Sequence, residues 1–205
     1  MFDAHCHIGT PCDQALVCTS STFEFAILPS YPHRAYGILE PHEEDVEALE
    51  AMLAQDPDAL VGEIGLDARW SGSPPSLFPK LLEVAIHHTR PFVLHVVRRH
   101  EEVLRVIKDM HVQVPFIVHG FTSSREVALR YIRLGGTISL GPASRMTRHY
   151  ADLLDLPFLL ESDMPLGEDS QRVLDRLYRD VASDMGIEKN VLEEVVDGRR
   201  TVFTP

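Results

Sequence analysis

Six residues of the types that bind metals recur at the ends of short apolar runs along the chain. They are His5, His7, Glu63, His95, His119 and Asp163. Four imidazoles and two carboxylates are enough to hold two divalent cations. Two metals about 3.5–4 Å apart can ionise a bridging water and stabilise charge on the group that the water attacks. The residue types therefore predict metal-assisted hydrolysis.

The spacing of the first two histidines places them on one side of a strand. Because side chains alternate across a strand, His5 and His7 point to one side and Cys6 to the other. The simplest division puts His5, His7 and Asp163 on one ion, His95 and His119 on the second, and Glu63 between them as a bridge. Zinc, manganese, nickel, iron and magnesium all accept ligands from this set, and the sequence leaves the metal open.

The apolar runs alternate with amphipathic segments, which is typical of a parallel sheet with crossover helices. We expect strands at residues 1–6, 15–19, 35–39, 60–64, 92–96, 116–119, 136–140 and 158–161, with an ambiguous ninth run at 25–28. Helical spacing covers residues 43–55, 76–89, 101–110, 124–134 and 170–185. The pattern predicts an α/β fold, a TIM-like (β/α) barrel with its site at the C-terminal ends of the strands.

The N-terminal quarter is too short for a regular barrel. One βαβ unit takes about 30 residues, and two do not fit between Cys6 and Ala35. We expect loops such as residues 19–34 to replace one or two early helices. No linker divides residues 1–205, so we expect one domain. Apolar faces bared near residues 19–35 make a homodimer one hypothesis.

Composition limits the partners and the location that we expect. The formal net charge is -12, so the surface as a whole does not attract nucleic acid or anionic membrane. The three cysteines all lie within the first 18 residues and form no paired framework across the chain. We see no charged leader and no long apolar span, and we expect a cytoplasmic protein without a membrane partner.

Five stretches together resemble the TatD family of metal-dependent hydrolases, within the amidohydrolase superfamily. FDAHCHIG resembles the histidine-pair motif and VGEIGLD the glutamate motif, while FVLH, FIVHGF and LLESDMP resemble the three later ligand motifs. The matching motifs extend from residue 2 to about residue 165. The resemblance implies a TIM-like barrel with one or two metals that hydrolyses phosphodiester bonds, commonly as a deoxyribonuclease.

The resemblance also implies roles for single residues. Asp163 would bind metal and take a proton from the attacking water, with Glu63 as the second catalytic carboxylate. Asp3, Asp67 and Glu161 would support the ligands, because metal-bound histidines usually donate their other N–H to a carboxylate or carbonyl. For substrate contacts we consider Arg98, Arg145 and Trp70.

The chain departs from the family pattern around this site. Val96 and Val97 follow the third ligand histidine where relatives have serine and arginine, and Ala68 and Arg69 replace tyrosines after the glutamate motif. These departures put a DNA substrate in more doubt than hydrolysis itself. Two alternatives stay open, namely a metal-dependent ester, lactone or amide hydrolase and a non-catalytic metal-binding scaffold.

Overall fold

The structure is a computed structural model that describes residues 1–72 and 74–203. Eight parallel strands lie side by side in chain order, each hydrogen-bonded to the next. The strands are β1 (Asp3–Cys6), β2 (Ala15–Cys18), β3 (Arg34–Tyr36), β4 (Leu60–Asp67), β5 (Phe92–Val97), β6 (Phe116–Val118), β7 (Gly136–Leu140) and β8 (Phe158–Leu160). This is the expected TIM-like α/β barrel.

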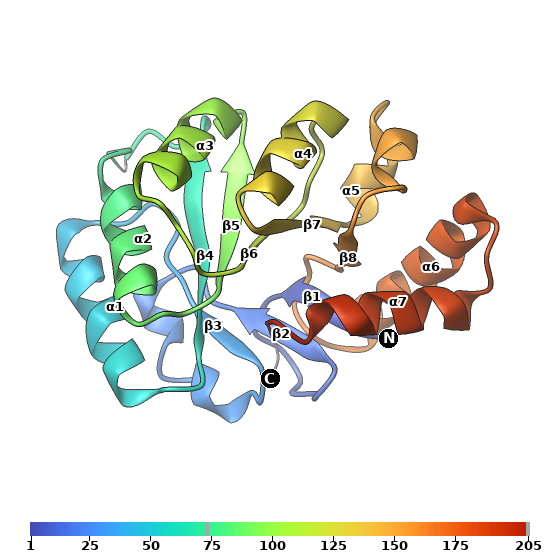
Figure 1. Cartoon of the computed structure of the whole chain (residues 1–205). Coiled ribbons are helices and arrows are strands. Elements are labelled where there is room, and N and C mark those ends of the chain that lie inside the picture. The colour runs from blue at the N-terminus through green and yellow to red at the C-terminus, as the bar shows by residue number, and fades with distance from the viewer. Residues whose placement is uncertain (73, 204–205) are drawn as a thin grey trace.

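Helices cover the outside of the sheet unevenly (Figure 1). They are α1 (Glu43–Gln55), α2 (Leu77–His87), α3 (His100–Asp109), α4 (Arg125–Arg133), α5 (Pro142–Arg145), α6 (Glu168–Met185) and α7 (Lys189–Arg200). Helices α1 to α4 follow one another around β3 to β7, while α6 and α7 pack together near β8. The five predicted helices are confirmed, whereas α5 and α7 had no prediction.

The N-terminal quarter is abbreviated, as expected. Residues 1–36 contain β1, β2 and β3 but no α-helix. Two short 3-10 turns, η1 (Thr22–Glu24) and η2 (Leu28–Ser30), connect β2 to β3, so the ambiguous run at residues 25–28 is not a strand. Phe23 in this segment is 93% exposed, and the expected homodimer stays a prediction.

Strand β4 extends three residues further than the sequence indicated and reaches Asp67. Gly65 makes this extension compatible with the sheet, because it pairs with His95 of β5 at very close range. A Cβ at this position would lie 1.9 Å from the His95 carbonyl oxygen. Glycine therefore keeps β4 against β5, and alternation then gives Glu63 and Asp67 the same side of the strand.

The barrel closes at its C-terminal rim through residues that follow β8. The Asp163 amide donates to the His5 carbonyl oxygen at 3.1 Å, and the His7 amide donates to the Met164 carbonyl oxygen at 2.9 Å. A parallel bridge joins His7 to Pro165. The two ends of the sheet thus meet at the histidine pair and Asp163.

Two other expectations concern the cysteines and the absence of a membrane-spanning helix. Cys6, Cys12 and Cys18 are free thiols. No helix within residues 1–72 and 74–203 has the length and apolar character needed to cross a membrane.

Candidate metal centre

The six predicted ligands come together at the C-terminal ends of five strands. They are His5 in β1, His7 just after it, Glu63 in β4, His95 in β5, His119 just after β6 and Asp163 just after β8. The ends of parallel strands share one rim of a barrel, so residues more than 150 positions apart in the chain become neighbours there.

The first group contains the two N-terminal histidines. The His7 Nε2 atom lies 3.3 Å from Asp163 Oδ1 and 3.8 Å from Glu63 Oε1. The His5 Nε2 atom lies 3.5 Å from Asp163 Oδ1 and 3.8 Å from Glu63 Oε1. Four donor atoms therefore converge on one small volume.

The second group uses the other oxygen of the same glutamate. Glu63 Oε2 lies 2.9 Å from His119 Nε2 and 3.3 Å from His95 Nδ1. The two imidazole nitrogens are 2.9 Å apart. Glu63 thus presents one oxygen to each group of histidines.

These separations match those of atoms that share a cation. Two ligand atoms about 2.0–2.1 Å from one zinc ion lie about 2.9–3.5 Å apart at angles between about 90° and 115°. The three distances of the second group fall in this range. The first group is slightly wider, at 3.3–3.8 Å, which fits ligands that lie more nearly opposite one another.

His5 gives an independent test of whether the site suits a metal. Its side chain is completely buried, and neither ring nitrogen has a hydrogen-bond partner. A buried polar atom without a partner costs about 1–3 kcal/mol. The Nε2 atom faces two carboxylate oxygens at distances that leave room for an ion, so a bound cation would satisfy it. The residues present therefore fit a divalent metal.

The carboxylates of the cluster are ionised. Burial opposes the charge on Glu63, but the His119 and His5 imidazoles hold the pKa of its carboxyl well below the usual range. Burial also opposes the charge on Asp163, but the adjacent His5 and His7 imidazoles keep its pKa low. Both groups are in the form that binds a cation.

Two of the three expected supporting carboxylates contact a histidine ring. Asp67 Oδ2 lies 3.1 Å from His95 Nε2, on the side of the ring away from Glu63. Glu161 Oε1 lies 3.5 Å from His119 Nδ1 and accepts a 2.6 Å hydrogen bond from the Gly120 amide. Each arrangement orients the ring so that its other nitrogen faces Glu63.

Asp3 is placed differently from the expectation that it orients a histidine ring. Its carboxylate accepts a 2.8 Å hydrogen bond from the Ser162 amide, next to Asp163. Burial raises the pKa of Asp3 to about 7. Asp3 therefore ties β1 to the backbone after β8, because its partner is main chain and not an imidazole.

Trp70 lies against the second group. Its indole stacks on the His95 ring, with ring centres 5.3 Å apart and an interplanar angle of 14°. A hollow of 420 Å³ adjoins it at the end of β4, and the lining includes Asp67, Phe78 and Arg99. From the sequence we favoured Arg98 over its neighbour Arg99, whereas the structure places Arg99 in the lining.

Neither of the two arginines proposed from the sequence lines this hollow. Arg98 is exposed and has a φ of 56°, which turns the chain between β5 and α3. Arg145 pairs with Asp180 at 2.5 Å and with Asp184 at 2.9 Å, both on α6. Those carboxylates compete with any substrate phosphate, so Arg145 acts as a structural tie between α5 and α6.

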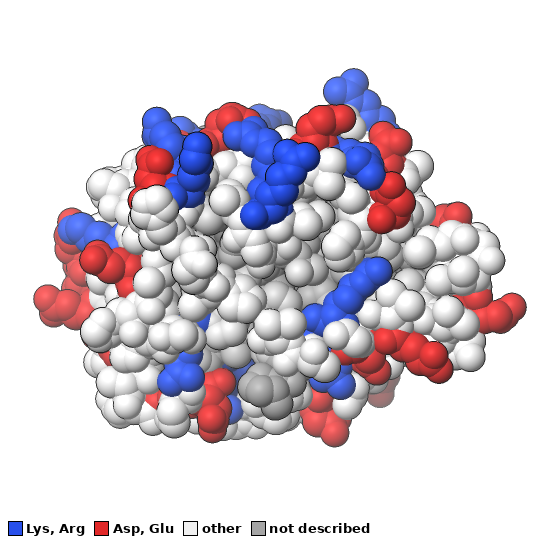
Figure 2. All heavy atoms as spheres, viewed as in Figure 1, with Lys and Arg blue, Asp and Glu red and all other residues white. Residues whose placement is uncertain are grey.

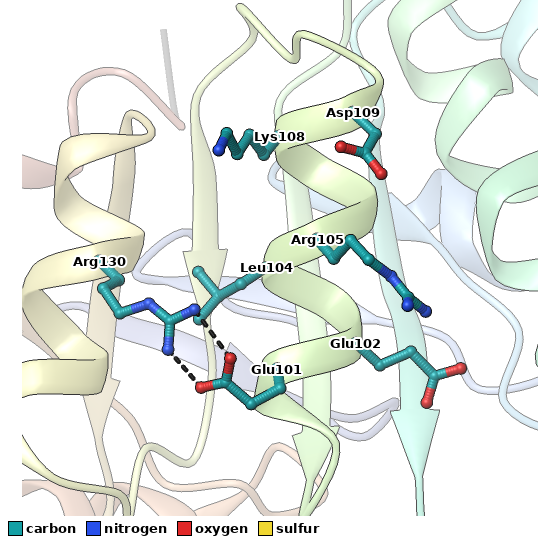
Figure 3. Close-up of a pocket in the computed structure, with 7 residues that line it drawn as sticks. All are labelled: Glu101, Glu102, Leu104, Arg105, Lys108, Asp109 and Arg130. Atoms are coloured by element: carbon teal, nitrogen blue, oxygen red, sulfur yellow. Dashed lines mark hydrogen bonds and ion pairs between the residues drawn. The ribbon is translucent and has the colours of Figure 1, made fainter.

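A larger hollow than the one beside Trp70 lies elsewhere. It has a volume of 660 Å³ and is lined by α3 and by Arg130 of α4. Figure 3 shows the Arg130 guanidinium facing Glu101, with Arg105 and Lys108 further along α3. These are solvated surface charges on the outer helices, so we assign this hollow no part in the chemistry.

The molecular surface carries charges of both signs. Figure 2 shows one face on which acidic and basic side chains lie interspersed around the edge, while the centre has few of either. Several of the arginines are paired with carboxylates, as Arg125 is with Asp155 and Arg130 with Glu101. This face has no continuous basic surface of the kind that binds duplex DNA.

Two bacterial proteins are similar to this chain in sequence. YjjV of Escherichia coli (strain K12), an uncharacterized metal-dependent hydrolase, is 33% identical over 144 residues, which are 63% of this chain and 55% of YjjV. YabD of Bacillus subtilis (strain 168), also an uncharacterized metal-dependent hydrolase, is 24% identical over 192 residues, or 88% of this chain and 72% of YabD. The chain thus spans about half of the first relative and nearly three quarters of the second.

Solved structures show the same fold. The crystal structure of the TatD homologue YjjV from E. coli K12 matches with a TM-score of 0.77 at 23% identity, covering 93% of this chain and 86% of that one. A TatD family hydrolase from Entamoeba histolytica matches with a TM-score of 0.74 at 14% identity, covering 93% and 84%.

The family model described as TatD related DNase matches residues 14–197. This match begins after the histidine pair, so the placement of His5 and His7 in the site rests on the distances above. Because the match spans most of the 205 residues, the chain belongs to the TatD related DNase family.

Proposed function

We propose that this protein is a metal-dependent hydrolase that cleaves phosphodiester bonds at a two-metal centre. The observation that carries the proposal is the position of Glu63, whose two oxygens face two adjacent pairs of histidines. The names of the family and of both curated relatives support hydrolysis with a metal. Bound divalent metals would activate a water and stabilise the charge that develops on the phosphoryl oxygens.

The protein's own residues would divide the work. His5, His7 and Asp163 would hold one ion, His95 and His119 would hold the other, and Glu63 would bridge them. The Asp163 side chain is 48% exposed, so it alone among the carboxylates of the cluster reaches the solvent from which water and substrate arrive. Its ionised carboxylate is therefore placed to accept the proton of the attacking water.

The alternative of carbonyl chemistry has less support. Some lactonase and amidase branches of the superfamily bridge their metals with a carbamylated lysine, and here Glu63 would take that place. The three lysines, Lys80, Lys108 and Lys189, lie on the outer helices α2, α3 and α7. Lys80 pairs with Glu43, and Lys189 pairs with Asp175. No lysine joins the cluster.

The net charge of the protein bears on the length of the substrate that we propose. The net charge of -12 repels a long polyanion, whereas a small phosphodiester needs only the cations of the site to bind. We therefore propose small phosphodiesters or short single-stranded ends ahead of duplex DNA.

The experiment is a comparison of two chromogenic substrates with the protein loaded with manganese or zinc. We expect hydrolysis of bis(p-nitrophenyl) phosphate to exceed that of p-nitrophenyl acetate and to fall at least a hundredfold in Asp163→Asn. Asp155→Asn is the matched control, because Asp155 is exposed and pairs only with Arg125 among its described contacts. Hydrolysis of the acetate alone would favour the carbonyl alternative. A metal-loaded protein with no turnover of either substrate would favour the scaffold.

A further inference from the structure

The hollow beside His95 has the character of a small-molecule site. Such sites usually enclose about 300–1,000 Å³ and combine apolar walls with a few polar groups. This one has a volume of 420 Å³ and lies between the loops that follow β3, β4 and β5. Its apolar walls include Pro41, Pro74, Pro75 and Phe78. We propose that it binds a planar aromatic group of the phosphodiester substrate, with Trp70 as the stacking surface.

The position of Trp70 links this hollow to the chemistry. The indole lies parallel to the His95 ring, and it also lines the hollow. The Asp67 carboxylate also connects the hollow to the site, because it lies 3.1 Å from His95 Nε2 and forms part of the lining. A group in the hollow is therefore separated from the second ligand group by one layer of side chains. We expect a phosphate attached to that group to extend past His95 toward Glu63, whose Oε2 lies 3.3 Å from His95 Nδ1.

The charges of the hollow suit an anionic ester. The Asp67 carboxylate is paired with the Arg69 guanidinium, which offsets its negative charge. Arg99 contributes a guanidinium whose described ion pair, with Glu102 at 3.0 Å, is exposed to solvent. An exposed ion pair is worth little, so Arg99 can turn toward a phosphate at small cost.

Stacking on an aromatic side chain needs a flat partner but no particular pattern of hydrogen-bond donors. The proposal therefore names the shared chemistry, a planar ring attached to a phosphate, of which a nucleobase and a simple aryl group are two sources. It rests on the proposed function, since the metals would hold the phosphate.

The chain offers a direct probe, because Trp70 is its one tryptophan. The fluorescence of the zinc-loaded protein can be followed during titration with phenyl phosphate, thymidine 5′-monophosphate and methyl phosphate. We expect the two aromatic phosphates to bind about tenfold more tightly than methyl phosphate. Tight binding of phenyl phosphate alone would assign the hollow to simple aryl groups. Tighter binding of the thymidine compound would assign it to nucleosides.

Two variants at Trp70 separate stacking from a general effect. By calorimetry, Trp70→Phe should keep most of the preference for phenyl over methyl phosphate, while Trp70→Leu should abolish it. Methyl phosphate should bind equally to all three proteins. Equal affinities for phenyl and methyl phosphate in the wild type, or an unchanged preference in Trp70→Leu, would overturn the inference. Aromatic preference without any hydrolysis would instead overturn the proposed function and leave this inference standing.

Discussion

The two groups of candidate ligands differ in where they come from and in how far they are buried. The first group joins the two ends of the sheet, and its His7 and Asp163 side chains are 29% and 48% exposed. The second group comes from adjacent strands in the middle of the sheet, and its His95 and His119 side chains are 15% and 6% exposed. The first group therefore meets the solvent through His7 and Asp163, although its His5 is completely buried, while both histidines of the second group are largely buried.

The supporting contacts follow the same division. His95 and His119 each face a carboxylate on the side away from Glu63, at 3.1 Å for Asp67 and 3.5 Å for Glu161, whereas His5 has no carboxylate behind its Nδ1 atom among the described contacts. An imidazole ring that is already oriented by a carboxylate at its second nitrogen loses less rotational freedom when a metal binds. The comparison indicates that the second group forms a preorganised metal position and that the first group carries the exposed groups that handle water.

The largest effect is expected from a substitution of Glu63, the residue that both ligand groups share. Glu63→Gln keeps the shape of the side chain but removes the charge that faces both groups. We expect kcat/KM for bis(p-nitrophenyl) phosphate to fall more than a hundredfold, because loss of a shared ligand should exceed the 10–100-fold cost of losing an outer contact. Circular dichroism should show a folded variant. Activity within tenfold of the wild type would mean that Glu63 is not a bridge.

A second substitution tests the exposed carboxylate of the first group, Asp163. Asp163→Asn should lower kcat about a hundredfold or more, because it removes both the proton acceptor and one ligand. Metal at the second group should remain, so the metal content should fall by about one ion per chain. Elemental analysis and steady-state kinetics on the same sample check both statements. Loss of both ions with this substitution would show that the two groups do not bind independently.

A third substitution tests the support of the second group by Asp67. Asp67→Asn weakens the contact that orients His95, and we expect metal affinity at one position to fall about 10–100-fold. The other position should be unaffected. Competition with a chromogenic chelator measures the two affinities in the variant and in the wild type. Asp155→Asn serves again as the matched control, and equal affinities in all three proteins would remove Asp67 from the account.

The smallest effect is expected outside both groups, at the tie between β3 and α1. Arg34 and Tyr36 both donate hydrogen bonds to Asp56. Burial opposes the charge on Asp56, but these bonds lower the pKa of its carboxyl. Asp56→Asn should reduce the free energy of unfolding by about 2 kcal/mol at pH 7 and leave metal content unchanged.

The same tie has a defined pH dependence. A carboxyl with a lowered folded-state pKa stabilises the protein above its unfolded pKa of about 3.9, and this contribution is lost as the pH falls through the folded value. The difference between wild type and Asp56→Asn should therefore be full at pH 6–7 and shrink below about pH 4. Urea unfolding at several pH values measures it. A difference that grows in acid would contradict the assigned pairing.

Much of the fold could be predicted, because the barrel depends on simple periodicity. Short apolar runs and amphipathic segments alternate along the chain, and each ends near a turn residue. The structure confirms all eight strands to within a few residues. Helix α7 was not predicted, although its buried residues Leu192 and Val196 have helical spacing.

The site was predictable where ligands end strands, and less so where loops decide the direction of a side chain. Alternation places His5 with His7, and Glu63 lies within β4, which continues to Asp67. Arg98 was considered in place of Arg99 because neighbouring residues in a turn cannot be told apart by periodicity, and the φ of 56° at Arg98 is a property of the folded loop. Asp3 was expected at a ring and instead meets the Ser162 amide, a contact that depends on how the barrel closes.

The most direct test of the account is the metal content of the wild-type protein beside that of Glu63→Gln. Both proteins would be purified without chelator, saturated with zinc or manganese, freed of excess metal and analysed by mass spectrometry. A two-metal centre bridged by Glu63 predicts about two ions per wild-type chain and a large loss in the variant. A wild-type protein that retains no metal, or a variant that retains the same amount as the wild type, would contradict it.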